Sequence, residues 1–162
     1  MLDDNIKRMI NGSWNFVEGK ISYEEKMKRL REGTVQNVLA YETDVIHTII
    51  TDMNEILAER GVVLQYSSRK GILQKEEAFI NGRITVVMED GRIKQFFDFM
   101  LCAHIKSPTH LYIKLPGKKF VKGKSIKGYI EYNIARIVNQ AFKYYAKYKS
   151  MELRKTRISE KV

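Results

Sequence analysis

The chain has 162 residues, enough for one domain to bury a substantial core without disulfide or metal cross-links. Its single cysteine, Cys102, excludes a disulfide framework, and no apolar run approaches the ~18 residues of a membrane-spanning helix. The formal net charge is +10, and the first residues are acidic without the apolar segment of a secretory signal, so we expect a cytoplasmic protein.

The first sixty residues are predicted to be helical. Residues 21–31 have the pattern of a short charged helix that ends at Gly33, and Thr34 is a suitable cap for a longer helix to Arg60, closed by Gly61. Along the longer helix, apolar residues recur every three or four positions, which predicts a stripe facing the core: Val35, Val38, Leu39, Val45, Ile46, Ile49, Met53, Ile56 and Leu57.

Beyond Gly61 the apolar period changes to two, which indicates strands. Residues 62–67 form one candidate strand, and Asn81-Gly82 and Asp90-Gly91 predict hairpin turns. Pro108 precedes a last strand over residues 110–115, and a helix is expected from about Ser125 to Lys149. The predicted fold is α+β, with N-terminal helices, an antiparallel meander of four or five strands and a long C-terminal helix. We expect one domain over residues 1–150 and a basic tail over 151–162.

The positive charge is concentrated in the last third of the chain. Residues 106–162 hold 15 Lys and Arg against 3 Asp and Glu, whereas the first 105 residues hold 14 against 16. Such asymmetry indicates an anionic partner, namely nucleic acid, a membrane surface or an acidic protein, although a basic solvated tail would give the same pattern.

The segment LPGKKFVKGKS, residues 115–125, resembles a phosphate-binding P-loop but has five residues between its glycines instead of four. We therefore expect no nucleotide hydrolysis here. Ser125 is a candidate cap of the last helix, whose free amide groups would attract an anion. Lysines gather around this helix start and are candidate phosphate ligands: Lys118, Lys119, Lys122, Lys124 and Lys127.

The last helix has two contrasting faces at 100° per residue. One face is apolar and is expected to pack on the sheet: Ile130, Ile134, Ile137, Val138, Ala141 and Tyr145. The other gathers aromatic and basic residues within about 60° of arc: Tyr129, Tyr132, Arg136, Lys143 and Lys147. Rings beside cations suit backbone neutralisation with base stacking, although a solvated face gives the same pattern. The basic run Arg154 to Arg157 favours binding.

Three residues resemble the site of metal-dependent nucleases of the restriction-enzyme type, where a helix carries Glu, a strand carries Asp and a next strand ends in Lys. Glu42 lies within the apolar stripe, Asp98 interrupts FFDFML, and Lys114 ends a strand. The second acid of that pattern would stand where this chain has Tyr112, which leaves the metal short of a ligand. Structural ion pairs are the alternative explanation.

The sequence therefore favours a small, basic, non-enzymatic nucleic-acid-binding protein without a cofactor or metal, because its histidines show no ligand spacing. The alternative is a phage-type inhibitor, similar in kind to anti-CRISPR proteins, that binds a host protein or ribonucleoprotein at a nucleic-acid site. The composition resembles that of products of AT-rich Gram-positive bacteria, their phages or mobile elements. The choice between DNA and RNA, the strandedness and the oligomeric state stay open.

Overall fold

The computed structural model describes residues 2–91, 94–115, 118–122 and 125–160, without the side chains at positions 72, 74, 118–122, 125 and 157–160. The elements follow one another as α1 (Asp4–Tyr41), the π-helical segment η1 (Glu42–Ile46), α2 (His47–Leu57), the 3-10 turn η2 (Ala58–Arg60), β1 (Val62–Gln74), β2 (Glu77–Met88), β3 (Lys94–His104), β4 (Ser107–Leu115), β5 (Lys118–Lys122) and α3 (Ser125–Glu160). The predicted α+β fold is confirmed: N-terminal helices, an antiparallel meander and a long C-terminal helix.

One helical rod runs from Asp4 to Arg60, so the predicted helix end at Gly33 is wrong. Thr34 is not a cap but is buried inside α1, where its hydroxyl donates a hydrogen bond to the Leu30 carbonyl at 2.6 Å. A helical glycine costs about 1 kcal/mol relative to alanine, and burial of the following Val38 against the sheet offsets that cost. The predicted end at Gly61 is confirmed, because this residue has a left-handed φ of 67°.

The five strands pair in sequence order as an antiparallel sheet. The predicted turn at Asp90-Gly91 is confirmed: Gly91 has a φ of 71°, and its N–H donates to the Met88 carbonyl at 2.8 Å. The predicted turn at Asn81-Gly82 is wrong. Both residues lie inside β2, where Gly82 pairs with Ser68 on one side and Phe99 on the other.

Gly82 does not form a turn; its missing side chain leaves room for a ring from the adjacent strand. A Cβ atom at this position would lie 2.5 Å from Cζ of Phe99, a buried ring that stacks between Tyr66 and Phe97. The hairpin between β1 and β2 turns at Lys75-Glu76 instead, where both residues have positive φ, of 50° and 63°. A type I′ hairpin turn requires positive φ at both central residues, and two non-glycine residues supply it here.

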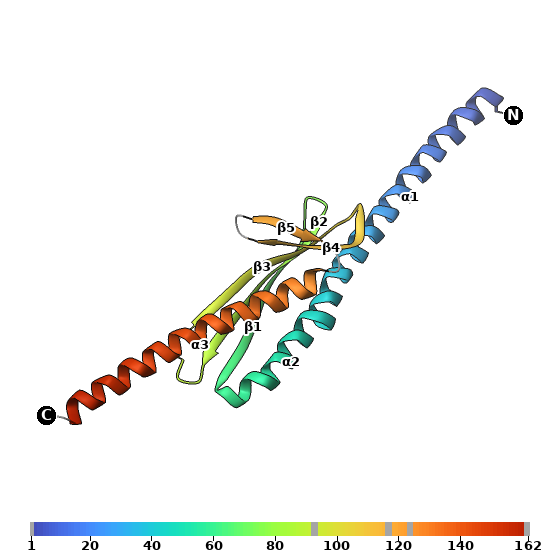
Figure 1. The fold of residues 1–162 in the computed structure, drawn as a ribbon. Coiled ribbons are helices and arrows are strands. Elements are labelled where there is room, and N and C mark those ends of the chain that lie inside the picture. The colour runs from blue at the N-terminus through green and yellow to red at the C-terminus, as the bar shows by residue number, and fades with distance from the viewer. Residues whose placement is uncertain (1, 92–93, 116–117, 123–124, 161–162) are drawn as a thin grey trace.

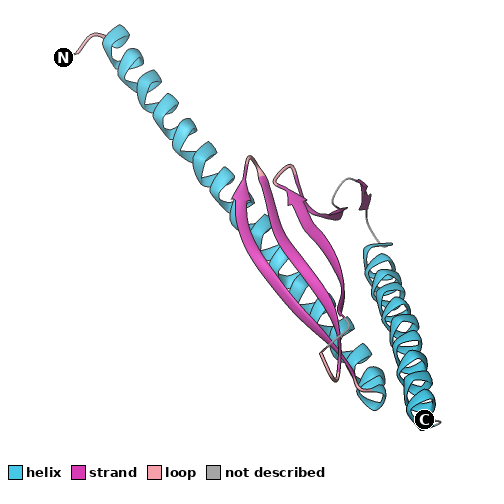
Figure 2. Cartoon of the chain, turned by 90° about the vertical axis from the view of Figure 1, so that its left-hand side faces the viewer, coloured by secondary structure: helices cyan, strands magenta, loops and turns pink. Residues whose placement is uncertain are grey.

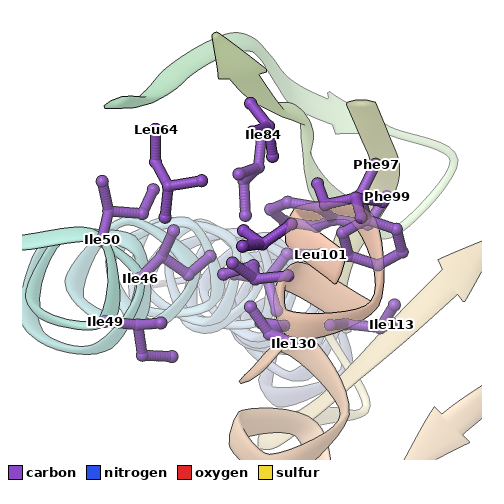
Figure 3. Close-up of a cluster of buried hydrophobic side chains, with 14 of the residues drawn as sticks. Ile46, Ile49, Ile50, Leu64, Ile84, Phe97, Phe99, Leu101, Ile113 and Ile130 are labelled. Carbon is purple, nitrogen blue, oxygen red and sulfur yellow. The ribbon is translucent and has the colours of Figure 1, made fainter. Parts of the chain in front are cut away.

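The core lies between one face of the sheet and the helices. In β2, residues alternate between this buried face and the other, more exposed face. Figure 3 shows Ile46 and Ile50 beside the strand residues Leu64, Ile84 and Leu101, with Ile130 of α3 next to this group. Figure 2 shows the long strands lying across the helical rod, with α3 as a separate helix.

Both long helices extend beyond this core, and their free ends point in opposite directions (Figure 1). The helix α3 continues to Glu160, so its predicted end near Lys149 is wrong, and residues 151–160 of the expected tail are helical. Another correction concerns residues 118–122, which were expected to be part of a loop. They form β5, whose backbone pairs with β4 through Tyr112 with Lys122 and Ile113 with Val121.

Candidate nucleic-acid interface

The inward face of α3 was predicted correctly. Ile130, Ile134, Ile137 and Ala141 are at most 1% exposed, and Val138 is also buried. Tyr145 is half-buried and packs against the same cluster. Because these side chains hold one face of α3 against the sheet, the rotation of the helix about its own axis is determined over residues 126–141. The orientation of the opposite face follows from this packing.

The outward face of α3 exposes four of the five aromatic and basic residues predicted for it. Tyr132 is 67% exposed, and Arg136, Lys143 and Lys147 are exposed as well. Tyr129 is the exception, since it is half-buried and its ring meets Phe97 edge-on with centroids 6.5 Å apart. Tyr129 thus lies at the margin of the core, where it packs on the sheet instead of pointing outward.

A row of cations follows this outward face. At 100° per residue, Arg136, Lys143, Lys147 and Arg154 fall within about 40° of arc and span about 27 Å at 1.5 Å per residue. We call these four residues the cationic row. Within the part of the chain that the structure describes, Lys143 and Lys147 have no ion-pair partner, whereas Arg136 bonds to Asn133 Oδ1 at 3.3 and 3.4 Å.

Two acidic residues of α3, Glu131 and Glu152, lie on the other half of the helix. Glu131 pairs with Lys127 at 3.9 Å, and Glu152 pairs with Lys149 at 3.6 Å. Both glutamates fall about 140° to 160° from the cationic row. Lys127 and Lys149 thus each have a carboxylate neighbour, whereas no ion pair to the cationic row is found among the described residues.

Only part of the predicted lysine cluster can be placed. The backbone of Lys118, Lys119 and Lys122 lies in β5, while their side chains, and the whole of Lys124, fall outside the described residues. Ser125 is the first residue of α3, and what caps this helix lies outside the description as well. Lys127 is exposed in the first turn of α3.

The open face of the sheet holds a groove of about 860 Å³ that sequence reasoning missed. Arg69, Asn81, Arg83 and Lys114 line it together with Asp98. Arg83 binds Asp98 with both ends of its guanidinium group, at 2.7 and 2.9 Å, and lies 4.3 Å from the centre of the Phe96 ring. The alternation of polar residues in β1 and β2 predicts that these side chains share one face of the sheet. It does not predict that this face is hollowed into a groove.

The three residues of the nuclease resemblance do not converge. Glu42 is buried on the helix-covered face, where it accepts a hydrogen bond from the Tyr66 hydroxyl at 2.5 Å and lies 4.0 Å from Lys70. Asp98 lies on the opposite face of the sheet, paired with Arg83. Among the described residues, no group of three or more His, Cys, Asp and Glu side chains has the arrangement of a metal site. Each carboxyl group thus has a structural partner.

A second polar cluster surrounds Glu77 on the open face. Its carboxylate accepts hydrogen bonds from the Tyr112 hydroxyl and from Lys114 Nζ, the latter at 3.0 Å. Burial raises the pKa of Glu77, but the bonds from Tyr112 and Lys114 outweigh it and bring this pKa below its ordinary value. Cys102 lies beside this cluster, fully buried, and burial together with the Glu77 charge raises the pKa of its thiol to about 12.

The Cys102 thiol is expected to make the fold sensitive to alkali. Because its pKa is higher in the folded protein than the ordinary 9.0, its contribution is fully present below pH 9 and is lost as the pH rises toward 12. The free energy of unfolding should fall by about 1.4 kcal/mol from this group by pH 10. Urea melts of the wild type and of Cys102→Ala from pH 8 to pH 10 isolate the effect. Parallel pH profiles of the two proteins would contradict it.

A search of protein families, of curated proteins and of solved structures found no match to this chain. None of the described helices combines the length and the apolar character needed to cross a membrane.

Proposed function

We propose that the protein binds the phosphate backbone of nucleic acid through the outward face of α3. The observation that carries this proposal is the separation of charge on that helix. Arg136, Lys143, Lys147 and Arg154 lie in one row, whereas Glu131 and Glu152 lie on the other half of the helix. A solvated helix would gain from interspersed i to i+4 ion pairs, and the cationic row has none.

The surroundings of the row suit the same ligand. In the sequence, the lysine-rich residues 118–124 directly precede α3, and we propose that they add positive charge at the start of this helix. Tyr132 is exposed beside Arg136 and is available to stack on a base or sugar. We therefore propose that the lysine-rich segment and α3 contact phosphates together, with no chemical step.

The phage-type inhibitor is the second candidate. The positive charge of the cationic row disfavours an inhibitor that occupies the nucleic-acid site of a host protein. A protein site that receives nucleic acid is lined by cations, which would repel the cationic row. The row fits an inhibitor that contacts the RNA of a ribonucleoprotein, similar in effect to an anti-CRISPR protein. Such an inhibitor would bind the assembled ribonucleoprotein more tightly than free RNA.

Two matched double variants test the proposal. Lys143→Gln with Lys147→Gln removes two charges from the cationic row, and Lys28→Gln with Lys149→Gln removes two exposed charges that lie outside the predicted nucleic-acid contacts. Anisotropy titrations with single- and double-stranded DNA and RNA at 50 to 200 mM salt should show weaker binding for the first pair alone. On duplex DNA its salt slope should drop by up to ~0.9 log units per lost phosphate contact.

The outcomes separate the two candidates. Equal losses in both double variants would show attraction to net charge without a defined surface. If the wild type binds none of the four nucleic acids at 50 mM salt, the binding proposal is wrong and the inhibitor takes its place.

A further inference from the structure

The N-terminal part of α1 stands alone. Residues 2–26 are all exposed, and the helix first becomes buried at Thr34. Figure 1 shows this segment projecting away from the sheet. We call residues 2–33 the arm. Nine large hydrophobic side chains on it are between 40% and 72% exposed: Leu2, Ile6, Met9, Ile10, Trp14, Phe16, Val17, Ile21 and Tyr23. A concentration of this kind on one surface marks a site of interaction.

The arm is amphipathic and is weak as an isolated helix. At 100° per residue, Ile6, Ile10, Trp14, Val17 and Ile21 fall within about 80° of arc, and we call them the seam. Gly12, Gly19 and Gly33 lie in the same helix, and nothing comes within 4 Å of where a Cβ would stand. These glycines disfavour the helix without serving a close contact inside the monomer. A partner that covers the seam would supply the missing stability.

The seam has a symmetry that identifies one occupant. Four of its five positions read the same in both chain directions about a point between Ser13 and Trp14: Ile6 mirrors Ile21, and Ile10 mirrors Val17. The fifth, Trp14, falls opposite Ser13 at that point. We propose that the arm pairs antiparallel with the arm of a second copy, about a two-fold axis at that point. Ile6 of one copy then meets Ile21 of the other, and Ile10 meets Val17. An interface of this kind is isologous, since one surface serves both partners.

The charges beside the seam fit the same register. Lys7 and Glu18 lie on the same flank of the seam, and a two-fold axis brings this flank of one copy against the same flank of the other. Lys7 then lies within about 3 Å along the axis of Glu18 from the second copy, and the pair occurs twice. The seam ends where Asp3 would lie opposite Glu24, two acids that disfavour a longer overlap.

The available area suits a stable dimer. A fully buried aromatic side chain removes roughly 150–250 Å² from water, so a half-exposed aliphatic or aromatic side chain still offers on the order of 100 Å². The five seam residues with Leu2 and Met9 at its edge thus offer about 700 Å² per copy. Interfaces of stable complexes take roughly 600–1,000 Å² from each partner. The arm therefore reaches the size of a standard interface without any contribution from the sheet or from α3.

Light scattering and sedimentation measure whether the full chain is a dimer. Ile10→Lys with Val17→Lys places charges in the seam, and Asn11→Lys with Asn15→Lys adds the same charge on the polar face of the arm. We expect a dimer for the wild type and for the polar-face variant, and at least 100-fold weaker association for the seam variant. A wild type that stays monomeric at ~100 μM overturns the proposal. So does a monomer that binds vesicles of anionic lipid through the seam, because the arm then belongs to a membrane surface.

Cysteine cross-linking tests the antiparallel register. Ser13→Cys lies beside the two-fold axis and should link two copies through a disulfide under mild oxidation. Ile6→Cys should not link to itself, but should link to Ile21→Cys when the two variants are mixed. The wild type, whose only cysteine is the buried Cys102, is the control. Self-linking of Ile6→Cys would indicate parallel helices and overturn the proposal.

Discussion

Replacing Ile134 by alanine is expected to lower the free energy of unfolding by about 2 to 5 kcal/mol. Ile134 is 0% exposed on the inward face of α3, within the cluster that joins this helix to the sheet. Truncation removes buried apolar surface and leaves a cavity, since the neighbouring strands are held by their ladders and relax only partly. Urea denaturation followed by circular dichroism measures the loss. Ile137→Ala, at 1% exposure, should behave alike.

The matched control for this prediction lies on the other face of the same helix. Tyr132→Ala removes a larger side chain, but Tyr132 is 67% exposed, so the change in stability should stay within about 0.5 kcal/mol. If Tyr132 stacks on a base, this variant should instead weaken nucleic-acid binding by about 1 to 3 kcal/mol. If Tyr132→Ala lowered the free energy of unfolding as much as Ile134→Ala does, the outward face of α3 would be packed and would not be a binding surface.

Replacing Tyr66 by phenylalanine is expected to lower the free energy of unfolding by about 2 to 4 kcal/mol. The Tyr66 hydroxyl donates to Glu42 Oε2 at 2.5 Å, and Glu42 is 4% exposed. The variant keeps the ring, its stacking on Phe99 and its volume, so the loss comes from a buried carboxyl group without its donor. Lys70, at 4.0 Å and 57% exposed, compensates little. Urea denaturation at pH 7 measures the loss.

A double variant separates this polar contact from packing. Glu42→Leu with Tyr66→Phe replaces both partners by apolar groups, so no buried polar group is left unsatisfied. We expect the double variant to be more stable than Tyr66→Phe alone, with a coupling of about 1 to 3 kcal/mol between the two positions. Independent, additive effects would show that the hydrogen bond contributes nothing to the fold.

Much of this architecture could be predicted from local patterns in the sequence. The change of apolar period from three or four to two after Gly61 separated the helices from the strands, and Asp90-Gly91 marked a real turn. The two faces of α3 followed from helical geometry, because Ile134 and Tyr132 point to different sides of any helix that contains them both. For the candidate interface, the outward positions of Arg136, Lys143 and Lys147 were predictable for the same reason.

Other features depended on neighbours that are distant in the sequence. Asn81-Gly82 has the composition of a turn, yet the ring of Phe99 from the adjacent strand requires a glycine there inside β2. Gly33 is a residue type that often ends helices, yet α1 continues past it because Val38 is buried against the sheet. Asp98 and Glu42 resemble parts of one site, yet Asp98 lies on the open face of the sheet, whereas Glu42 comes from the helical rod that covers the other face.

Local composition by itself thus determined the succession of helices, antiparallel strands and a last helix, the inward face of α3 and the concentration of charge in the last third of the chain. Tertiary structure alone decided where the rod begins to pack, which turn joins β1 to β2, and that the apolar seam of the arm is left outside the core. The physical reason is that period and propensity describe a residue within its own element, whereas burial and close approach are set by the element that packs against it.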